Sequence, residues 1–334
     1  MAAADALSTP ADGYRIDRRP AHDERVDHRP AERSRKPSWL RVTMPPARAY
    51  RATTAVLDDL DLHTVCEAAR CPNKGECFAA GTATFLIGGE VCTRACGFCA
   101  VAHARTALRP FDPDEPRRVA EAAACLGLAH VVVTGVTRDD QPDGAAAHYA
   151  ATVVALRERL PRATVEVLVP DFGGDEAALR VVLAARPEVL NHNLETVPRL
   201  YPLVRPQAGY ERSLELLARA AVWARSETAG ARSLDHPGPP ARSRPLVKTG
   251  LMVGLGETMA EVEEALGDIA QRRLDLVTIG QYLQPAPDCL PVARYVAPEE
   301  FTELAALGPT LGLRIIAGPF VRSSYRAGEA LGQE

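Results

Sequence analysis

Six of the eight cysteines in this chain lie between Cys66 and Cys99, and this clustering constrains the chain more than any other feature. In a short secreted protein such a density would indicate disulfides. A chain of 334 residues with no apolar stretch near its N-terminus does not fit that class. We therefore expect reduced thiolates that bind metal, in a cytoplasmic compartment. Cys125 and Cys289, outside the cluster, are expected to be structural or free thiols.

The overall composition excludes several classes of partner. A formal net charge of -4 gives no general attraction to nucleic acid or to an anionic membrane. No apolar run approaches the roughly 20 residues that a membrane-spanning helix needs. We expect no nucleic acid and no membrane as a partner.

From Ala83 onward, short apolar runs alternate with amphipathic stretches. The runs expected to form strands are 83–87, 130–134, 164–169, 188–191, 247–253 and 276–280. The stretches expected to form helices are 113–126, 144–160, 175–185, 211–226 and 258–273. Six such repeats indicate an α/β fold with a parallel sheet and crossover helices, which can curl into a full or partial barrel.

Two segments depart from this alternation. Residues 1–38 carry mixed charges and Pro with almost no large apolar side chains, so we expect a disordered tail, with a targeting or partner-binding role as the alternative. Residues 227–245 are rich in Arg, Ser, Pro and Gly, which indicates a surface loop or, alternatively, a lid. After Pro298 we expect one more helix, the apolar run 313–318 and a polar tail.

Cys92, Cys96 and Cys99 form a C-x3-C-x2-C motif shortly after the apolar run 83–87. Three thiolates on one tight loop can hold three irons of a cubane cluster. This loop has no fourth cysteine, so one iron would keep an open position for another ligand. A zinc site is the alternative, but zinc generally takes four ligands in C-x2-C pairs.

This motif resembles the signature of the radical S-adenosylmethionine (SAM) superfamily, in which an aromatic residue, here Phe98, precedes the last cysteine. The resemblance implies that SAM chelates the open iron of a [4Fe–4S] cluster. Reduction then cleaves a carbon–sulfur bond of SAM and releases a 5′-deoxyadenosyl radical. The protein would place that radical against one C–H bond and exclude solvent.

A second triplet, Cys66, Cys71 and Cys77, has the spacing C-x4-C-x5-C. Alone it could be a structural metal site. Beside the first triplet it resembles the auxiliary [4Fe–4S] cluster motif of the lipoyl synthase family. Further stretches are similar to that family at 36–40, 83–89, 137–140, 170–172, 191–197, 248–258, 279–285 and 317–325.

The resemblance also implies a fourth ligand and a domain division. In the family a serine of an Arg-Ser-Ser-Tyr motif ligates the auxiliary cluster, which implies Ser324 here, with Ser323 as the alternative. Without the resemblance, both would be polar tail residues. We expect the tail over 1–38, an extension with the auxiliary motif over 39–82, a partial (β/α)6 TIM-like barrel of the radical SAM type over 83–312, and a closing C-terminal segment over 313–334.

Residues at the ends of predicted strands are candidates for SAM contacts. Asn191, Asn193 and Glu195 alternate onto one face at the end of a barrel where active sites lie. They suit hydrogen bonds to the ribose hydroxyls or the amino group of SAM, or they could cap the next helix instead. The candidates after other strands are Thr134, for the methionine part, and Gly254 and Gly256, for the adenine.

The reaction that the resemblance implies is insertion of two sulfur atoms, at C6 and C8, into an octanoyl chain on a carrier lysine. The auxiliary cluster would be the sulfur donor. The implied partners are octanoylated lipoyl carrier domains, of a 2-oxoacid dehydrogenase E2 component or a glycine cleavage H protein, and a reductant such as ferredoxin or flavodoxin. The rivals are another radical SAM sulfur-inserting enzyme, biotin-synthase-like or a methylthiotransferase, and a two-cluster electron-transfer protein. The last would need more protein ligands than six clustered cysteines.

Overall fold

The computed structural model of the chain describes residues 36–41, 47–79, 83–104, 106, 108–226, 244–324 and 327–328. Most of the tail expected over 1–38 and most of the loop expected over 227–245 lie outside these described residues. Within them, no helix combines the length and the apolar character needed to cross a membrane.

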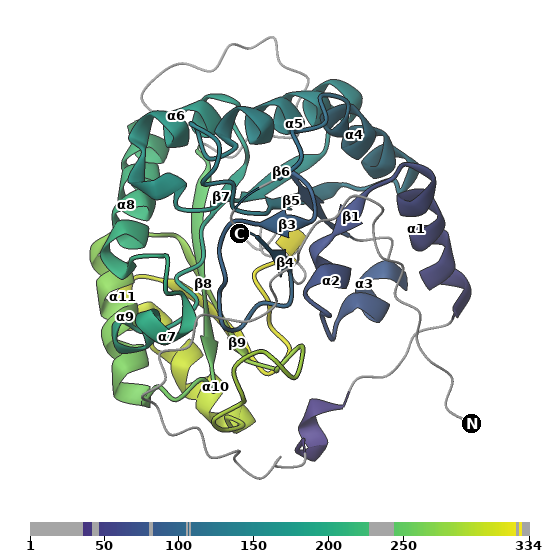
Figure 1. The fold of residues 1–334 in the computed structure, drawn as a ribbon. Coiled ribbons are helices and arrows are strands. Elements are labelled where there is room, and N and C mark those ends of the chain that lie inside the picture. The colour runs from purple at the N-terminus through teal and green to yellow at the C-terminus, as the bar shows by residue number, and fades with distance from the viewer. Residues whose placement is uncertain are drawn as a thin grey trace, which may run out of the picture.

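One large sheet organises the described residues. In spatial order its strands are β1 (His63–Thr64), β2 (Thr84–Ile87), β5 (His130–Gly135), β6 (Thr164–Leu168), β7 (Val189–Asn191), β8 (Leu246–Val253), β9 (Leu276–Gln281) and β10 (Arg314–Gly318). β1 is antiparallel to β2, and all the other neighbours are parallel. The sheet curls into an open barrel with helices on its outside (Figure 1). These strands are near-continuous apolar runs because both faces are covered.

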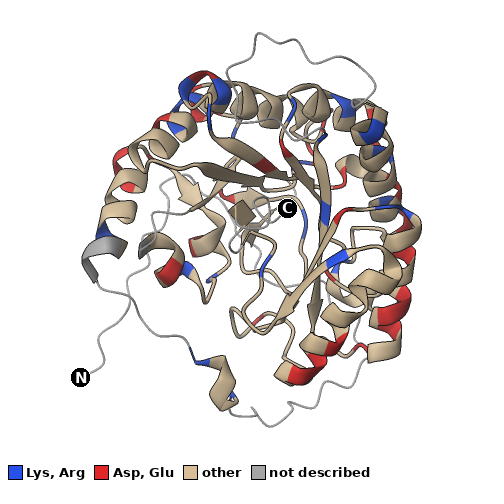
Figure 2. Cartoon of the chain, turned by 180° about the vertical axis from the view of Figure 1, so that it is seen from behind, with Lys and Arg blue, Asp and Glu red and all other residues tan. Residues whose placement is uncertain are grey.

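The outer layer consists of helices that connect successive strands. The longer ones are α4 (Glu115–Cys125), α5 (Ala146–Arg159), α6 (Glu176–Ala184), α8 (Tyr210–Ser226), α9 (Met259–Gln271) and α10 (Pro298–Ala306). The short ones are α7 (Tyr201–Val204), α11 (Gly308–Leu311), η2 (Phe172–Gly174) and η3 (Pro198–Leu200). Each strand and helix expected by residue range is confirmed, with ends shifted by one or two residues. Both signs of charge occur on the outer helices, while the strands are mostly uncharged (Figure 2).

A helical extension precedes β2 and packs beside it. It consists of η1 (Ser38–Leu40), α1 (Ala47–Asp59), β1, α2 (Val65–Ala68) and α3 (Lys74–Ala79). Thr53 Oγ1 donates to Phe78 O at 2.7 Å and joins α1 to α3. The Phe78 ring is fully buried and stacks on Tyr50 at 5.4 Å between centroids. The extension is therefore an ordered part of the structure, attached to the sheet through β1.

β10 adds a seventh parallel strand to the six that the sequence predicts. It pairs with β9 from Arg314, opposite Leu276, to Gly318, opposite Gly280. The connection through α10 and α11 is one more strand–helix–strand unit of the same type. The segment expected over 313–334 thus begins within the sheet, and only the residues after Gly318 leave it.

Candidate functional site

The first cysteine triplet lies in a loop that a small sheet closes. β3 (Val91–Cys92) pairs in parallel with β4 (Ala102–His103). Between them, Cys99 N donates to Cys96 O at 3.1 Å and tightens the C-x2-C turn. The loop follows β2 at the carboxyl end of the parallel strands, where active sites of such barrels lie.

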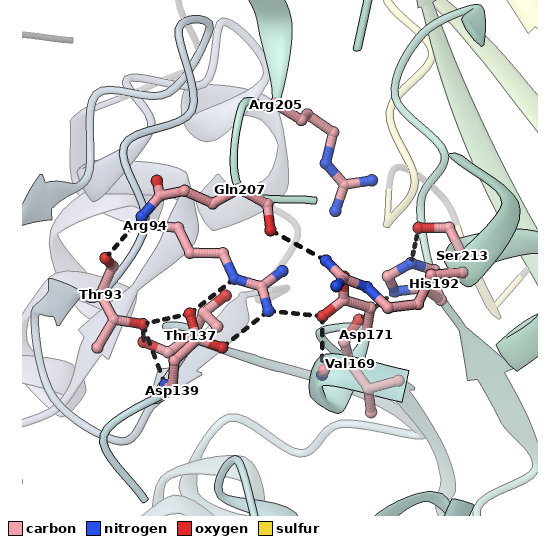
Figure 3. A network of polar contacts seen from close by, with 12 residues as sticks. Thr93, Arg94, Thr137, Asp139, Val169, Asp171, His192, Arg205, Gln207 and Ser213 are labelled. Atoms are coloured by element: carbon pink, nitrogen blue, oxygen red, sulfur yellow. Dashed lines mark hydrogen bonds and ion pairs between the residues drawn. The ribbon is translucent and has the colours of Figure 1, made fainter. Parts of the chain in front are cut away.

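Arg94, inside the C-x3-C part of the triplet, fixes this loop to the barrel (Figure 3). Its guanidinium donates to Asp139 at 2.8 and 2.7 Å and to Asp171 at 2.6 Å. Asp171 also accepts from Arg212 at 2.8 Å. Burial alone would raise the pKa of Asp171, but hydrogen bonds and charge from Arg94 hold it well below its ordinary value. Charge-assisted, bidentate bonds of this kind hold a fixed geometry.

The C-x2-C turn is held from the other side by the end of α7 and by the segment that contains Leu290. Gly97 N donates to Val204 O at 2.9 Å, and Leu290 N donates to Gly97 O at 2.7 Å. A Cβ on Gly97 would lie 2.9 Å from Leu290 Cδ1 and 3.1 Å from Leu203 O. Glycine is therefore needed for this close approach.

Two thiols of this loop, those of Cys96 and Cys99, have raised pKa values. Burial raises the pKa of Cys96 to about 11, against the positive charge of Arg205, which favours the thiolate. Burial also raises the pKa of Cys99 well above its ordinary range. Iron binds thiolates, so assembly of a cluster here would release protons.

Three polar contacts involve sulfur in or beside this triplet. Cys92 Sγ accepts from the backbone amides of Arg94 at 3.4 Å and Thr137 at 3.3 Å. Backbone N–H groups directed at a cysteine sulfur are one means by which proteins tune iron–sulfur clusters, so this donor set fits such a group. Cys289 is buried and donates to Cys99 O at 3.5 Å, as expected of a structural thiol.

The second triplet lies on the extension and is docked against β2. Cys66 is in α2, Cys77 is in α3, and Cys71 N, between the two helices, donates to Cys66 O at 3.0 Å. Burial raises the pKa of the Cys66 thiol to about 11, against hydrogen bonds to Thr84 in β2. β2, which contacts the Cys66 thiol through Thr84, leads directly into the loop of the first triplet.

The C-terminal segment lies against the second triplet. Asn73 Nδ2 donates to Phe320 O at 2.7 Å. Burial lowers the pKa of Arg322, and the negative charges of Cys71 and Glu195 act in the opposite direction. Ser323 Oγ donates to Asn193 Oδ1 at 2.8 Å. Ser323 and Ser324 follow in a half-buried turn. This segment thus links the second triplet with the residues after β7.

Asn191, Asn193 and Glu195 come together at the end of β7. Asn193 Nδ2 donates to Glu195 Oε1 at 3.0 Å. Asn191 Nδ2 donates to Glu166 Oε1 at 3.2 Å, while its Oδ1 is buried without a hydrogen-bond partner among the described residues. Glu195 adopts a left-handed φ of 68°, and burial raises the pKa of its carboxyl, against the charge of Arg205. Residues with left-handed backbone cluster at binding sites, and a buried oxygen without a partner can accept a hydrogen bond from a ligand.

The other cofactor candidates already have partners within the fold. Thr134 Oγ1 donates to Leu168 O at 3.1 Å, and Phe98 packs partly buried against the core. The amide of Gly254 donates to the Glu257 carboxylate, and a Cβ on Gly254 would lie 2.2 Å from Gln281 Nε2. The close approach of Gln281 therefore explains why residue 254 is a glycine. The carbonyl of the other candidate, Gly256, accepts from Arg199 at 2.9 Å.

The described residues contain no group of three His, Cys, Asp or Glu side chains placed to hold a single metal ion. This finding does not test a cubane, in which each thiolate binds a different iron at a different corner. The donor set, three thiols in each of two short segments, is the chemistry that a [4Fe–4S] cluster requires.

Sequence reasoning did not single out the arginines of this site. Arg94 lies inside the first triplet and Arg322 inside the Arg-Ser-Ser-Tyr motif, so proximity to a ligand was an available signal. No sequence pattern near Arg205 pointed to a role in the site. Its Nη1 donates to Asn193 O at 2.8 Å, and its Nε is buried without a hydrogen-bond partner in the described part of the chain.

Comparison with known proteins identifies two families along the chain. Residues 11–71 match the family model of the N-terminal domain of lipoyl synthase of the radical SAM family, and residues 86–222 match that of the radical SAM superfamily. The crystal structure of Streptococcus suis SuiB is similar in fold, with a TM-score of 0.50 and 12% identity over 73% of this chain and 52% of that one.

Curated relatives extend the match over most of the chain. The lipoyl synthase of Nitratidesulfovibrio vulgaris is 52% identical over 297 residues, which cover 89% of this chain and 92% of the relative. That of Thermus thermophilus is 50% identical over 296 residues, 87% of this chain and 85% of the relative. That of Rubrobacter xylanophilus is 46% identical over 324 residues, 97% of this chain and 93% of the relative. The resemblance expected from the two triplets is confirmed, and the chain belongs to the lipoyl synthase family of radical SAM enzymes.

Proposed function

We propose that this enzyme inserts two sulfur atoms, at C6 and C8, into an octanoyl chain carried on a protein lysine, in the cytoplasm. The observation that carries the proposal is the meeting of three segments at one end of the barrel. The C-terminal segment is bonded to the second triplet, where Asn73 donates to Phe320 O at 2.7 Å, and to the end of β7, where Ser323 donates to Asn193 Oδ1 at 2.8 Å. Arg205 donates to Asn193 O at 2.8 Å, and the carbonyl of the preceding Val204 accepts from Gly97 of the first triplet at 2.9 Å. Such an arrangement suits a donor and a radical source that act on one substrate.

The cofactors of the enzyme are iron–sulfur clusters and SAM. When bound, they supply a 5′-deoxyadenosyl radical for hydrogen abstraction and sulfur for the new C–S bonds. In the proposal Cys92, Cys96 and Cys99 hold the radical cluster. The auxiliary cluster is the sulfur donor, and its proposed ligands are Cys66, Cys71, Cys77 and Ser324.

The residues after β7 have the groups needed to orient SAM. Asn193 and Glu195 form one hydrogen-bonded pair. The Oδ1 of Asn191, which has no partner among the residues that the structure describes, is an acceptor for a hydroxyl or an amino group. Phe98, Thr134, Gly254 and Gly256 are the proposed contacts from the other loops. The Leu290 side chain packs against Gly97 of the cluster loop.

Membership in the family implies a lipoyl carrier protein as the substrate. We propose the carrier domain of a 2-oxoacid dehydrogenase E2 component or a glycine cleavage H protein, with a ferredoxin or a flavodoxin as the electron source. The charged outer helices carry both signs (Figure 2), so charge alone does not select one carrier.

An anaerobic assay with an octanoyl-lysyl peptide tests the proposal. The reconstituted enzyme should hold iron and sulfide for two clusters, and it should produce 5′-deoxyadenosine and a lipoyl peptide. Cys66→Ser, Cys71→Ser and Cys77→Ser should still cleave SAM but form no lipoyl group. Cys125→Ser, at an exposed cysteine that ends α4, is the matched control and should behave as the unmodified enzyme. Normal lipoyl formation by any of the first three variants would refute the donor assignment.

A further inference from the structure

Ser323 has both its hydroxyl and its carbonyl engaged inside the barrel. Its Oγ donates to Asn193 Oδ1 at 2.8 Å. Its carbonyl oxygen accepts a hydrogen bond from Lys248 Nζ. The C-terminal segment is thereby attached to β8 and to the residue pair that follows β7.

The anchor on β8 is itself fixed. Lys248 is buried in the barrel and donates to Glu166 Oε1 at 2.9 Å and Oε2 at 3.2 Å. Glu166 also accepts from Asn191 at 3.2 Å. A buried ion pair with further hydrogen bonds holds its members in one arrangement, so the Ser323 carbonyl is bonded to a rigid group.

Two glycines provide the surface on which this segment rests. A Cβ on Gly250 of β8 would lie 2.8 Å from both Ser323 Oγ and Asn193 Oδ1. A Cβ on Gly280 of β9 would lie 2.0 Å from Val321 O. Any side chain at either position would displace the C-terminal segment. Glycine at these positions therefore allows the segment to pack directly on β8 and β9.

The hydroxyl of Ser323 completes the hydrogen bonding of Asn193. The amide nitrogen of Asn193 donates to Glu195 Oε1 at 3.0 Å, and its backbone carbonyl accepts from Arg205 at 2.8 Å. Ser323 is the donor to the remaining side-chain oxygen. With all three bonds made, the amide has one orientation, and Glu195 is held beside it.

We propose that Ser323 is a positioning residue of the SAM site, and that the two adjacent serines divide the work between the two cofactor sites. Ser323 orients Asn193 and Glu195 from inside the barrel, and Ser324 is the serine left to ligate the auxiliary cluster. The inference rests on the proposed function, because it concerns the ligands and cofactor of that reaction. A hydroxyl already bonded to an amide inside the barrel is not available to iron beside Cys71.

Ser323→Ala and Ser324→Ala in the reconstituted full-length enzyme separate the two roles. SAM affinity is read from the change in the electron paramagnetic resonance spectrum of the reduced radical cluster as SAM is added. One lost hydrogen bond should weaken SAM binding by roughly 3- to 10-fold in Ser323→Ala. Its iron content and the Mössbauer signal of the auxiliary cluster should stay unchanged. Ser324→Ala should show the reverse: SAM affinity kept, and the non-thiolate iron site of the auxiliary cluster lost.

Gly250→Ala tests the same contact without touching either serine. Its added methyl group would separate Ser323 from Asn193, so SAM binding should weaken at least as much as in Ser323→Ala. Gly267→Ala is the matched control, because a Cβ there, in α9, would meet no atom within 4 Å. SAM affinity of this control should equal that of the unmodified enzyme.

The proposal is overturned if Ser323→Ala and Gly250→Ala both bind SAM with unchanged affinity. It is also overturned if Ser323→Ala, and not Ser324→Ala, loses the non-thiolate iron site. If Ser323→Ala fails to fold, the proposal is tested by the SAM affinity of Gly250→Ala compared with that of Gly267→Ala. Lipoyl formation by the unmodified enzyme is measured in parallel, since its absence would refute the proposed function and leave the SAM-binding comparison intact.

Discussion

Removing the guanidinium of Arg94 should weaken the attachment of the first cysteine triplet's loop to the barrel. In Arg94→Met the aliphatic part of the side chain is kept, while the bonds to Asp139 and Asp171 are lost. The Arg94 side chain is 5% exposed, and those of Asp139 and Asp171 are 42% and 0% exposed. The two acids therefore respond differently: water can solvate Asp139, but Asp171 stays buried.

The expected loss of unfolding free energy depends on the groups that still surround Asp171 in the variant. Breaking a buried ion pair from one side costs about 3–5 kcal/mol, because an uncompensated charge is left in the interior. Asp171 keeps Arg212 at 2.8 Å, so we expect the lower end, about 3 kcal/mol. At about 2 °C per kcal/mol for a domain of this size, the melting temperature should fall by roughly 6 °C.

The assay is thermal unfolding of the iron-free protein, followed by iron counting after identical anaerobic reconstitution. Arg180→Met is the matched control, because it removes an Arg–carboxylate pair with Glu176 whose side chains are 73% and 44% exposed. Such a surface pair contributes about 0–1 kcal/mol. Arg94→Met should melt lower than this control and hold less iron. Equal melting temperatures and equal iron would refute the structural role of Arg94.

Three further predictions concern buried positions of the barrel strands and of the residues that follow them. Lys248→Met should lower the free energy of unfolding by about 3–5 kcal/mol, and adding Glu166→Gln should restore much of it; equal losses in single and double variants would contradict the buried pair. Gly280→Ala should lose iron from the auxiliary cluster but keep the radical cluster, since its Cβ would meet Val321 O; full iron content would disprove the contact. Burial, helped by nearby positive charge, lowers the pKa of His192 to about 4, so the unfolded chain binds its proton more readily. Stability should therefore be complete above about pH 6.5 and fall by on the order of 3 kcal/mol toward pH 4, a slope that His192→Gln should flatten in iron-free protein.

The strands and helices were predictable because their signals are local. β5 contains the buried run Val131–Val133, and Thr258 caps the start of α9, where its side chain and that of Glu261 form a capping box. The apolar run that becomes β10 was also visible, but its partner was not. Apolar residues favour a strand without specifying which edge it joins, so the seventh parallel strand emerged only from the packed structure.

The polar connections of the site were not predictable in the same way. Arg94 and Asp171 are 77 positions apart, and Ser323 and Asn193 are 130 apart. A charged or polar side chain is buried only where its partner is supplied by the tertiary structure, so no local pattern announces it. The cysteine spacings were readable because each triplet lies within one short stretch of sequence. The residues that hold these stretches in place come from distant parts of the chain.

The barrel interior explains why the C-terminal segment belongs to the core. In a closed eight-stranded barrel, branched apolar side chains fill the interior. Here Glu166 and Lys248 are buried in the interior, and the Ser323 carbonyl supplies a partner that the strands lack. The chain then reaches His130 at the start of β5, against which Gly328 lies. Because buried polar groups are costly without partners, withdrawing this segment would destabilise the barrel as well as remove a proposed iron ligand. The integrity of the auxiliary site and the stability of the fold therefore depend on the same contacts.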